Sequence, residues 1–395
     1  MDATQESNSP ARRWRWLASG VLVGLVLVLV TVLNYRLAVT VLGGMVNKDF
    51  MSVWGGARAL LLGLDPYDPQ VWPELRAQFG STWFPDPTCP FPAWTLMFFL
   101  PLALLPIAVA GAIWMTISEI SLVISIPWFL KAAGADRDAV LRIGMVLGAI
   151  AARPFLAALI NGQMIPVLVP VLAGAVLLYS RGRSFWFGFL LALLITKPNL
   201  FPLFYVGLAL LLLSRRDWAA IGGLAAGGTT LLGLSWIVSP GWLFRWLRVG
   251  TDKTIRFFSV PTLWGVSFDL LGGDLWIPVA IFASALVVVV TLVLVVRWRE
   301  DWLPALALAL GASLLTTPYL RAYDHILLLL PAVTAAVIGW RGRWQRLFPW
   351  LGLVLVLPWM FFGFAVAYGS DQWSALVTVA TIGYLFIGYG RARRV

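Results

Sequence analysis

The sequence predicts an all-α polytopic membrane protein that forms a single integral-membrane domain over residues 1–395. Of these residues 60% are hydrophobic and only 12% are charged, and the mean hydropathy is +0.86. Soluble domains are about 45–50% apolar and about 25% charged, so a water-facing globule could not bury this much apolar surface. Apolar runs recur to the end of the chain, and 22 tryptophans fit two interfacial belts. These observations exclude a soluble enzyme, a disordered chain and a secreted disulfide scaffold.

The first apolar run, about 17–33, follows a basic segment and is predicted to be a retained transmembrane helix. It is too long for the apolar region of a signal peptide, and the residues after it, Asn34-Tyr35-Arg36, offer no small-residue cleavage site. Further candidate spans lie at about 93–109, 111–130, 140–160, 164–180, 184–196, 199–213, 218–238, 275–296, 302–317, 326–340, 347–367 and 373–389.

The number of crossings follows from the lengths of these runs. A full crossing needs about 20 residues, so the runs at 184–196 and 199–213 are expected to be short, tilted or broken at Lys197-Pro198. One of the runs at 93–109 and 111–130 is expected to be re-entrant, unless the two runs around Lys197 form one broken helix, because otherwise the later loops fall on the wrong side. We therefore expect about 11 to 13 transmembrane helices.

Short basic loops predict the orientation, because Lys and Arg are enriched on the cytoplasmic side of a membrane. This rule places the amino and carboxyl termini in the cytoplasm, together with the clusters at 12–15, 181–183, 215–216, 297–299, 341–346 and 391–394. Two longer loops, about 34–92 and about 239–274, then lie on the extracytoplasmic side of the cell membrane. The net charge of +11 is thus explained by membrane orientation, and no nucleic-acid partner is expected.

The long first outer loop, 34–92, is the main departure from a plain helix bundle. Residues 65–69 form a predicted turn, and residues 71–76 form an amphipathic stretch after it. Residues 81–92 are rich in proline and are not expected to be helical. We expect this loop to lie on the membrane surface and to frame a cavity.

Several site types are missing from the sequence. The single cysteine, Cys89, and the single histidine, His325, exclude an intramolecular disulfide and a zinc site with several His ligands. No group of acidic residues has the spacing of a divalent-metal site, so we expect no metal and no cofactor. A GxxxxGK phosphate-binding loop is also missing, which argues against ATP-driven transport.

Asp49 is the first candidate for chemistry. It follows the outer end of the first predicted helix and is expected at the mouth of the bundle. A carboxylate in this position can accept a proton from a hydroxyl group and so act as a general base. The alternative is a solvated loop acid beside Lys48.

A second polar group lies at the outer end of a later predicted helix. Asp324 and His325 are adjacent there and follow Tyr319 and Arg321. Ionisable residues at membrane depth are costly and often functional. His325 can donate to a phosphate or orient a carboxylate. The alternative is a cluster that only anchors the helix end at the interface.

Three further positions interrupt apolar runs with polar groups. Lys197 has no nearby counter-ion in sequence, so it must snorkel, pair with an acid on another helix or bind an anion such as a lipid phosphate. Asn161 and Gln163 could hydrogen-bond sugar hydroxyls. They could equally satisfy backbone groups that are freed by Gly162 and Pro166.

The second outer loop carries basic residues against the topological rule. Residues 242–248 combine aromatic and basic side chains in an interfacial pattern, and Lys253 and Arg256 follow. Binding of a lipid phosphate is one explanation, and Arg256 is the candidate for it. An interfacial helix whose arginines contact ordinary headgroups is the other.

Taken in order, these pieces resemble the polytopic glycosyltransferases of the GT-C fold, and in particular glycosyltransferase family 87. That family includes the polyprenol-phosphate-mannose-dependent mannosyltransferases. The resemblance covers about residues 45–330 and rests on Asp49-Phe50, 59–67, 101–106, Asn161-Gly162-Gln163, Lys197-Pro198, Pro318-Tyr319 and Tyr323-Asp324. The sequence departs from the family at Phe91-Pro92-Ala93, where an aromatic-Pro-Pro step is usual.

The resemblance implies a GT-C-like bundle and a function. The expected enzyme moves a sugar, with mannose favoured, from a polyprenyl-phosphate donor to a lipid-linked or cell-envelope glycan acceptor on the extracytoplasmic side. It implies inversion, independence of metal and Asp49 as the general base. Expected partners are the donor, a glycolipid or glycan acceptor and membrane lipids. The residues expected to bind the donor phosphate are His325, Lys197 and Arg256, and those expected to bind substrate are Asp324, Gln163, Asn161, Tyr67, Tyr319 and Arg321.

Two other functions remain open at this point. A flippase or transporter of lipid-linked sugars would share the basic loops and the intramembrane lysine. Its sequence would also be expected to show internal repeats and charges near the bilayer midplane. A polymerase or ligase of envelope glycans would also have many helices, with arginines and a histidine in a large outer loop. Loss of sugar transfer in an Asp49→Asn variant would separate the first function from these two.

Overall fold

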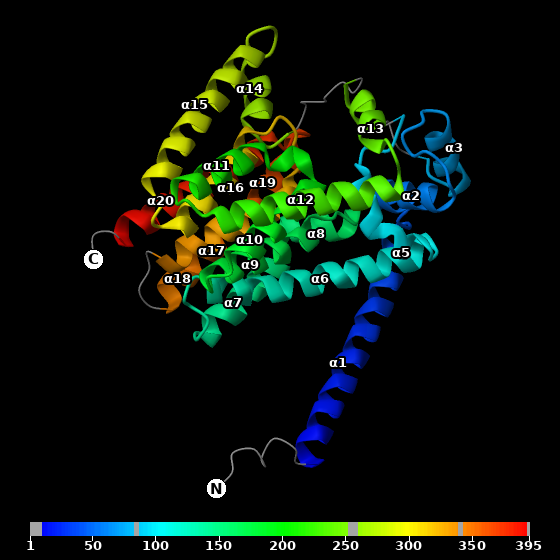
Figure 1. The fold of residues 1–395 in the computed structure, drawn as a ribbon, viewed down its shortest axis with the longest axis horizontal. Coiled ribbons are helices and arrows are strands. Elements are labelled where there is room, and N and C mark those ends of the chain that lie inside the picture. Colours follow the sequence, from blue (N-terminus) through cyan, green and yellow to red (C-terminus); the bar gives the residue numbers. More distant parts are fainter. Residues whose placement is uncertain (1–9, 83–86, 252–259, 339–342, 393–395) are drawn as a thin grey trace.

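The computed structural model describes residues 10–82, 87–251, 260–338 and 343–392. Every regular element within these ranges is helical, which confirms the predicted all-α class (Figure 1). The α-helices are α1 (Pro10–Arg36), α2 (Phe50–Leu61), α3 (Val71–Gln78), α4 (Ala93–Leu96), α5 (Leu100–Ala103), α6 (Ile107–Ala132), α7 (Ala139–Ile150), α8 (Arg153–Asn161), α9 (Ile165–Ser180), α10 (Ser184–Ala192), α11 (Pro202–Ser214), α12 (Trp218–Val238), α13 (Trp242–Thr251), α14 (Leu263–Leu271), α15 (Trp276–Arg297), α16 (Trp302–Thr316), α17 (Leu329–Ile338), α18 (Arg343–Leu351), α19 (Leu357–Tyr368) and α20 (Ala375–Ala392). The 3₁₀ and π segments are η2 (Leu37–Val41), η3 (Met97–Phe99), η4 (Leu193–Thr196), η5 (Pro198–Leu200), η6 (Ala322–Leu328), η7 (Gly352–Val356) and η8 (Gln372–Ser374).

Six helices in the described part of the chain are long and apolar enough to cross a membrane, so the protein is a multi-pass membrane protein. A seventh span arises if α7 and α8 are counted together across their 50° bend. The apolar runs alone predict about 11 to 13 spans. The count by helix length is lower because glycine and proline divide several runs into helices of 10–17 residues. Gly162, Pro198 and Pro318 lie at three of these breaks.

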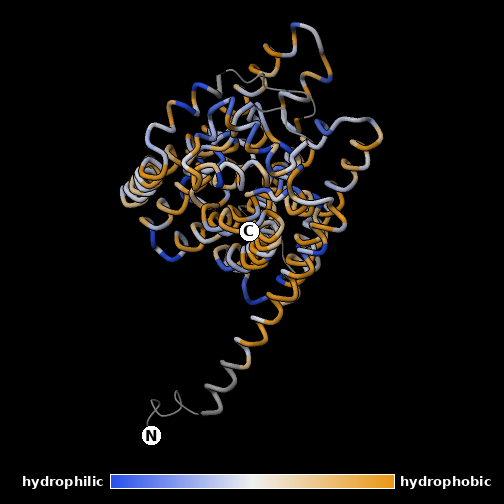
Figure 2. Tube along the Cα trace, turned by 90° about the vertical axis from the view of Figure 1, so that its right-hand side faces the viewer, coloured by the Kyte–Doolittle hydropathy of each residue, from blue (hydrophilic) through white to orange (hydrophobic). Residues whose placement is uncertain are grey.

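Helix α1 projects from the body of the protein, and its apolar surface is open along most of its length (Figures 1 and 2). Val21, Leu22 and Leu25 are each more than 60% exposed. The helix is held near its carboxyl end, where Asn34 donates to Thr116 and Glu119 of α6, both at 3.1 Å. Such an apolar surface suits hydrocarbon rather than water.

Three short helices, α9, α11 and α16, connect two ends of the bundle. At one end, Lys197 before α11 lies 3.2 Å from Gln163 before α9, and Thr317 after α16 donates to the Asn199 carbonyl at 2.5 Å. With 13 to 16 residues, these helices are only about 20–24 Å long. The hydrocarbon core of a bilayer is about 30 Å thick. These three helices are therefore shorter than the hydrocarbon core.

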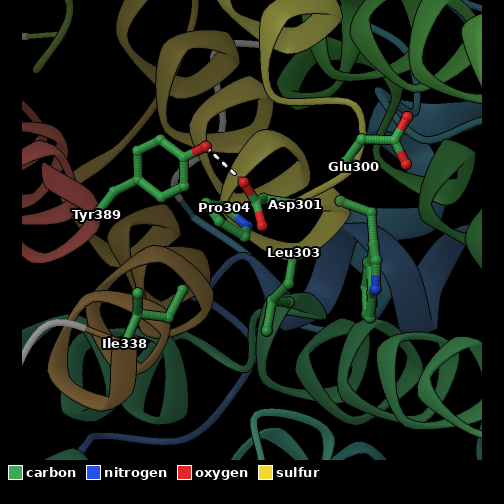
Figure 3. A pocket seen from close by; sticks show the side chains of 7 residues that line it. Glu300, Asp301, Leu303, Pro304, Ile338 and Tyr389 are labelled. Atoms are coloured by element: carbon green, nitrogen blue, oxygen red, sulfur yellow. Dashed lines mark hydrogen bonds between the residues drawn. The ribbon is translucent and has the colours of Figure 1, made fainter. Parts of the chain in front are cut away.

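The opposite ends of α11 and α16 meet among the basic loops. Arg215, after α11, lies 4.0 Å from Glu300, which precedes α16. A pocket of about 330 Å³ lies beside Glu300, and in it the Tyr389 hydroxyl of α20 donates to Asp301 at 2.6 Å (Figure 3). This pocket is separated from the helix breaks by the full length of α16.

The first outer loop folds as the sequence predicts in its middle part. Asp65 and Asp68 accept hydrogen bonds from the backbone of Tyr67 and Gln70, at 3.0 and 2.8 Å, and α3 begins directly after this turn. Within the described residues of 81–92 the backbone is not helical, as expected. Helix α2, which the sequence analysis did not single out, adds a buried element to this loop.

The two expected outer loops touch each other. Arg245 of α13 lies 2.9 Å from Asp65, and the Trp246 indole donates to the Pro90 carbonyl at 3.0 Å. Helices α2, α3 and α13 accordingly gather at one end of the bundle (Figure 1). The expected loops therefore build one shared surface over the helix breaks.

Candidate active site

Asp49 lies at the amino end of α2, but it does not cap that helix. An Asp at this position usually accepts a hydrogen bond from a backbone N–H of the first turn. The Asp49 side chain makes no such bond. Its Oδ2 atom instead accepts from the Gln163 side-chain amide at 2.5 Å and from the Tyr323 hydroxyl at 3.3 Å. Asp49 is half-buried, and its carboxylate is turned toward the helix breaks rather than toward its own helix.

Gln163 reaches Asp49 because Gly162 ends α8 in a left-handed conformation, with a φ of +64°. A Cβ atom on Gly162 would lie 2.5 Å from the Cβ atom of Phe50, the residue after Asp49. Glycine thus permits both the turn and the close approach of the two segments. The Trp114 indole fixes the turn from α6 by donating to the Gln163 carbonyl at 3.2 Å.

Lys197 lies in the break between η4 and η5, and hydroxyl groups of neighbouring helices satisfy the carbonyls that this break leaves open. Thr95 donates to the Thr196 carbonyl at 2.6 Å, and Ser313 donates to the Leu200 carbonyl at 2.9 Å. Unsatisfied backbone groups are costly in hydrocarbon, so irregular backbone is stable there only with such partners. The break is therefore a fixed feature that holds Lys197 inside the bundle.

The charge of Lys197 is matched by Asp324 of η6. Their Nζ and Oδ1 atoms are 2.6 Å apart, and the side chains are 8% and 1% exposed. The other oxygen of Asp324 accepts from the backbone N–H of Arg321 at 2.9 Å. Lys197 also donates to Gln163 Oε1 at 3.2 Å and lies 5.0 Å from the centre of the Tyr323 ring.

These contacts join five side chains into one polar cluster, which consists of Asp49, Gln163, Lys197, Tyr323 and Asp324. Gln163 bridges its two halves, with the amide oxygen toward the lysine and the amide nitrogen toward Asp49. The opposite amide orientation would place donor against donor and acceptor against acceptor. The cluster therefore holds the Asp49 carboxylate in one direction.

The two carboxylates of the polar cluster differ in environment. Asp324 is fully buried and ion-paired, whereas Asp49 makes no ion pair with any described residue. Asp49 Oδ1 accepts no hydrogen bond within the described part of the chain, so one oxygen is fixed and the other is available. This arrangement suits acceptance of a proton from a bound hydroxyl. Among the described residues no three His, Cys, Asp or Glu side chains gather as metal ligands.

Arg321 supplies a cation next to the polar cluster. Burial lowers the pKa of its guanidinium, but Tyr319, Tyr323 and Asp49 together raise that pKa above its ordinary value, so Arg321 stays charged. Its Nε atom donates to the Tyr319 hydroxyl at 3.4 Å. Arg321 is only half-buried, so part of this residue remains accessible to an anion.

The structure places the predicted site residues His325 and Asn161 apart from the polar cluster. His325 is buried and lies 3.3 Å from Thr378 of α20. Asn161 donates to the carbonyl of Ala157, one turn back in α8, at 2.8 Å. This contact fits the alternative that its amide satisfies local backbone.

Tyr67 also lies apart from the cluster, in the first outer loop. It is buried and donates its hydroxyl to the Phe91 carbonyl at 3.0 Å. Burial raises the pKa of this hydroxyl well above its ordinary value, so it remains a donor. Arg256 lies outside the described residues.

Tyr323 is the cluster residue to which the sequence analysis assigned no role. Its hydroxyl lies 3.0 Å from Gln163 Nε2 and 3.3 Å from Asp49 Oδ2. The sequence signal that could have identified Tyr323 as a site residue is its position directly before Asp324.

A comparison with protein-family models finds one that matches residues 90–318, more than half of the chain, and that is described as Glycosyltransferase family 87. The matched range contains Gln163 and Lys197 of the polar cluster. Asp49, Tyr323 and Asp324 lie outside it. No curated protein matches the chain.

Proposed function

The chain belongs to glycosyltransferase family 87, and we propose that it transfers a sugar, with mannose the favoured one, from a polyprenyl-phosphate donor to a lipid-linked or cell-envelope glycan acceptor. The observation that carries the proposal is the state of Asp49. One oxygen is held by Gln163 and Tyr323; within the described part of the chain the other oxygen has no hydrogen-bond partner, and the carboxylate makes no ion pair. A general base needs this combination of fixed direction and available oxygen.

In the proposed reaction, Asp49 takes the proton of an acceptor hydroxyl. The acceptor oxygen then forms a bond to the anomeric carbon of the donor sugar, while the bond between that carbon and the phosphate oxygen breaks. The phosphate leaves with the bonding electron pair, and attack from the opposite side inverts the anomeric configuration. The base contributes about 10²–10⁴-fold to the rate.

The leaving phosphate needs a cation that is not already neutralised. Arg321 is best placed for this role, because it lies next to Asp324, is influenced electrostatically by Asp49 and makes no ion pair with a described residue. Lys197 is paired with Asp324 and therefore acts as a positioning residue that fixes Gln163. The phosphate-binding roles expected for His325 and Arg256 stay predictions.

We place the reaction on the extracytoplasmic side. The polar cluster lies at the end of the bundle opposite the loops of Arg215 and Glu300, which belong to the basic clusters. Loops on the cytoplasmic side are enriched in basic residues, so the end of the bundle that holds the polar cluster faces away from the cytoplasm.

The test uses the purified full chain, radiolabelled polyprenyl-phosphate mannose and candidate membrane glycolipids. We expect Asp49→Asn to lower the rate of labelled product formation at least 10²-fold, with donor binding retained. Glu74→Gln is the matched control, because Glu74 is an exposed acid of the same outer loop whose side chain makes no hydrogen bond or ion pair with another described residue. Transfer at the control rate by a folded Asp49→Asn variant would remove Asp49 as the base. Absence of product from the wild-type chain with every acceptor would contradict the donor class.

A further inference from the structure

A separate apolar groove of about 810 Å³ lies between α6, α9 and α10. Its walls are formed mainly by Pro127, Trp128, Val167, Pro170, Val171 and Leu190. The two prolines lie inside α6 and α9. Gly174 allows these helices to approach, since a Cβ atom there would lie 3.3 Å from the Trp128 ring. The groove is therefore part of the helix packing.

Four ionisable side chains also line this groove, namely Lys131, Asp136, Arg142 and Arg181. Lys131 lies in the last turn of α6, Arg142 in the first turn of α7, and Arg181 directly after α9. None of the four side chains makes a hydrogen bond or an ion pair with another described residue. We call these four side chains the charged rim. With three cations and one acid, the rim carries a net positive charge.

The charged rim and the apolar walls are parts of the same groove. Helices α6 and α9 run in the same direction, because Trp114 contacts Gln163 before α9 and Trp128 contacts Gly174 further along it. Lys131 and Arg181 are therefore at the same end. From Val167 to Arg181 the groove extends about 21 Å along α9, which exceeds the roughly 15 Å of one hydrocarbon leaflet.

We propose that this groove binds one phospholipid with a net negative headgroup. Its phosphate would lie among Lys131, Arg142 and Arg181, with an acyl chain against Trp128 and Val171. Charge complementarity selects an anionic headgroup, because guanidinium groups make strong hydrogen bonds to phosphate. The apolar walls select a lipid over a free phosphate, because only a lipid removes that surface from water.

This site is independent of the proposed sugar transfer. Gln163 precedes α9 and Arg181 follows it, so the helix separates the polar cluster from the charged rim by about 24 Å. The proposed position of the headgroup is therefore remote from Asp49.

The experiment measures lipid retained by the purified full chain in native mass spectrometry, after incubation with equal amounts of phosphatidylglycerol or phosphatidylcholine. We expect the wild-type chain to retain one phosphatidylglycerol, and Arg142→Gln/Arg181→Gln to retain at least tenfold less. Arg137→Gln/Arg183→Gln is the matched control, because it removes the same charge from exposed residues of the neighbouring loops that do not line the groove. Equal retention by both double variants would overturn the proposal, as would equal retention of the two lipids.

A second variant tests the apolar wall without a change in charge. Val171→Trp fills the groove, and we expect it to reduce phosphatidylglycerol retention at least tenfold. Retention at the wild-type level by this variant would overturn the acyl-chain part of the site. Displacement of the lipid by inorganic phosphate at equal concentration would show that the rim binds phosphate alone. Gel filtration and thermal unfolding verify that each variant is folded.

Discussion

Replacing Lys197 by methionine leaves the Asp324 carboxylate buried without its cation. The two charged atoms lie 2.6 Å apart, and the side chains are 8% and 1% exposed. At an effective dielectric constant of 20, the attraction at this distance is about 6 kcal/mol, and desolvation of both ions cancels a large part of it. Removal of one partner of a buried pair costs about 3–5 kcal/mol. We expect Lys197→Met to lower the free energy of unfolding by about this amount.

The double variant Lys197→Met/Asp324→Asn tests the cause of that loss. Asparagine retains an oxygen for the backbone N–H of Arg321, which lies 2.9 Å from Asp324 Oδ2, but it carries no charge. Because no buried charge is left unpaired, we expect the double variant to regain at least about 2 kcal/mol relative to Lys197→Met. Equilibrium unfolding in mixed micelles of the wild type, both single variants and the double variant gives this coupling energy.

Two results would refute the reasoning. A loss below about 1 kcal/mol for Lys197→Met would fall in the range of ordinary polar contacts between membrane helices, which average about 0.6 kcal/mol. A double variant as unstable as the sum of the two single variants would show that the charges do not interact. Arg183→Met serves as the control, since this exposed side chain should change stability by at most about 0.5 kcal/mol.

Three further predictions follow from the contacts of single residues. Tyr323→Phe removes the hydroxyl 3.3 Å from Asp49 and should lower kcat for sugar transfer about five- to tenfold with KM unchanged; an unchanged kcat would contradict the positioning role. Gly162→Ala should lower the free energy of unfolding by at least about 1 kcal/mol, because its Cβ atom meets Phe50; an unchanged unfolding midpoint would be inconsistent with that contact. Arg245→Gln should cost less than about 1 kcal/mol but speed proteolysis beside α13, and an unaltered cleavage rate would argue against the link to Asp65.

Hydropathy and composition predict the fold class because the burial of apolar surface adds up over many residues. They do not predict the packing. The contact between Gln163 and Asp49 joins positions 114 residues apart, and the ion pair of Lys197 and Asp324 joins positions 127 apart. The sequence analysis names these four residues as candidates in separate segments. Only the fold brings them together.

The same limit applies to residues that are neighbours in the sequence. His325 follows Asp324, but successive side chains of a 3₁₀ turn point about 120° apart, so His325 faces Thr378 of α20. Asn161 precedes Gln163 by two residues, and the left-handed Gly162 between them turns the chain. Polar residues that are close in sequence therefore face different parts of the structure, and the local sequence pattern does not predict which part each one faces.

The pairing of Lys197 with Asp324 has a consequence for the synthesis of the protein. The lysine leaves the ribosome 127 residues before its partner, and during that interval its ammonium group has to remain in contact with water or headgroups. Insertion of the later segment is the event that allows the lysine to withdraw into the bundle. A nascent chain that stops short of Asp324 thus carries a lysine whose charge has no partner, and this charge distinguishes it from the complete chain.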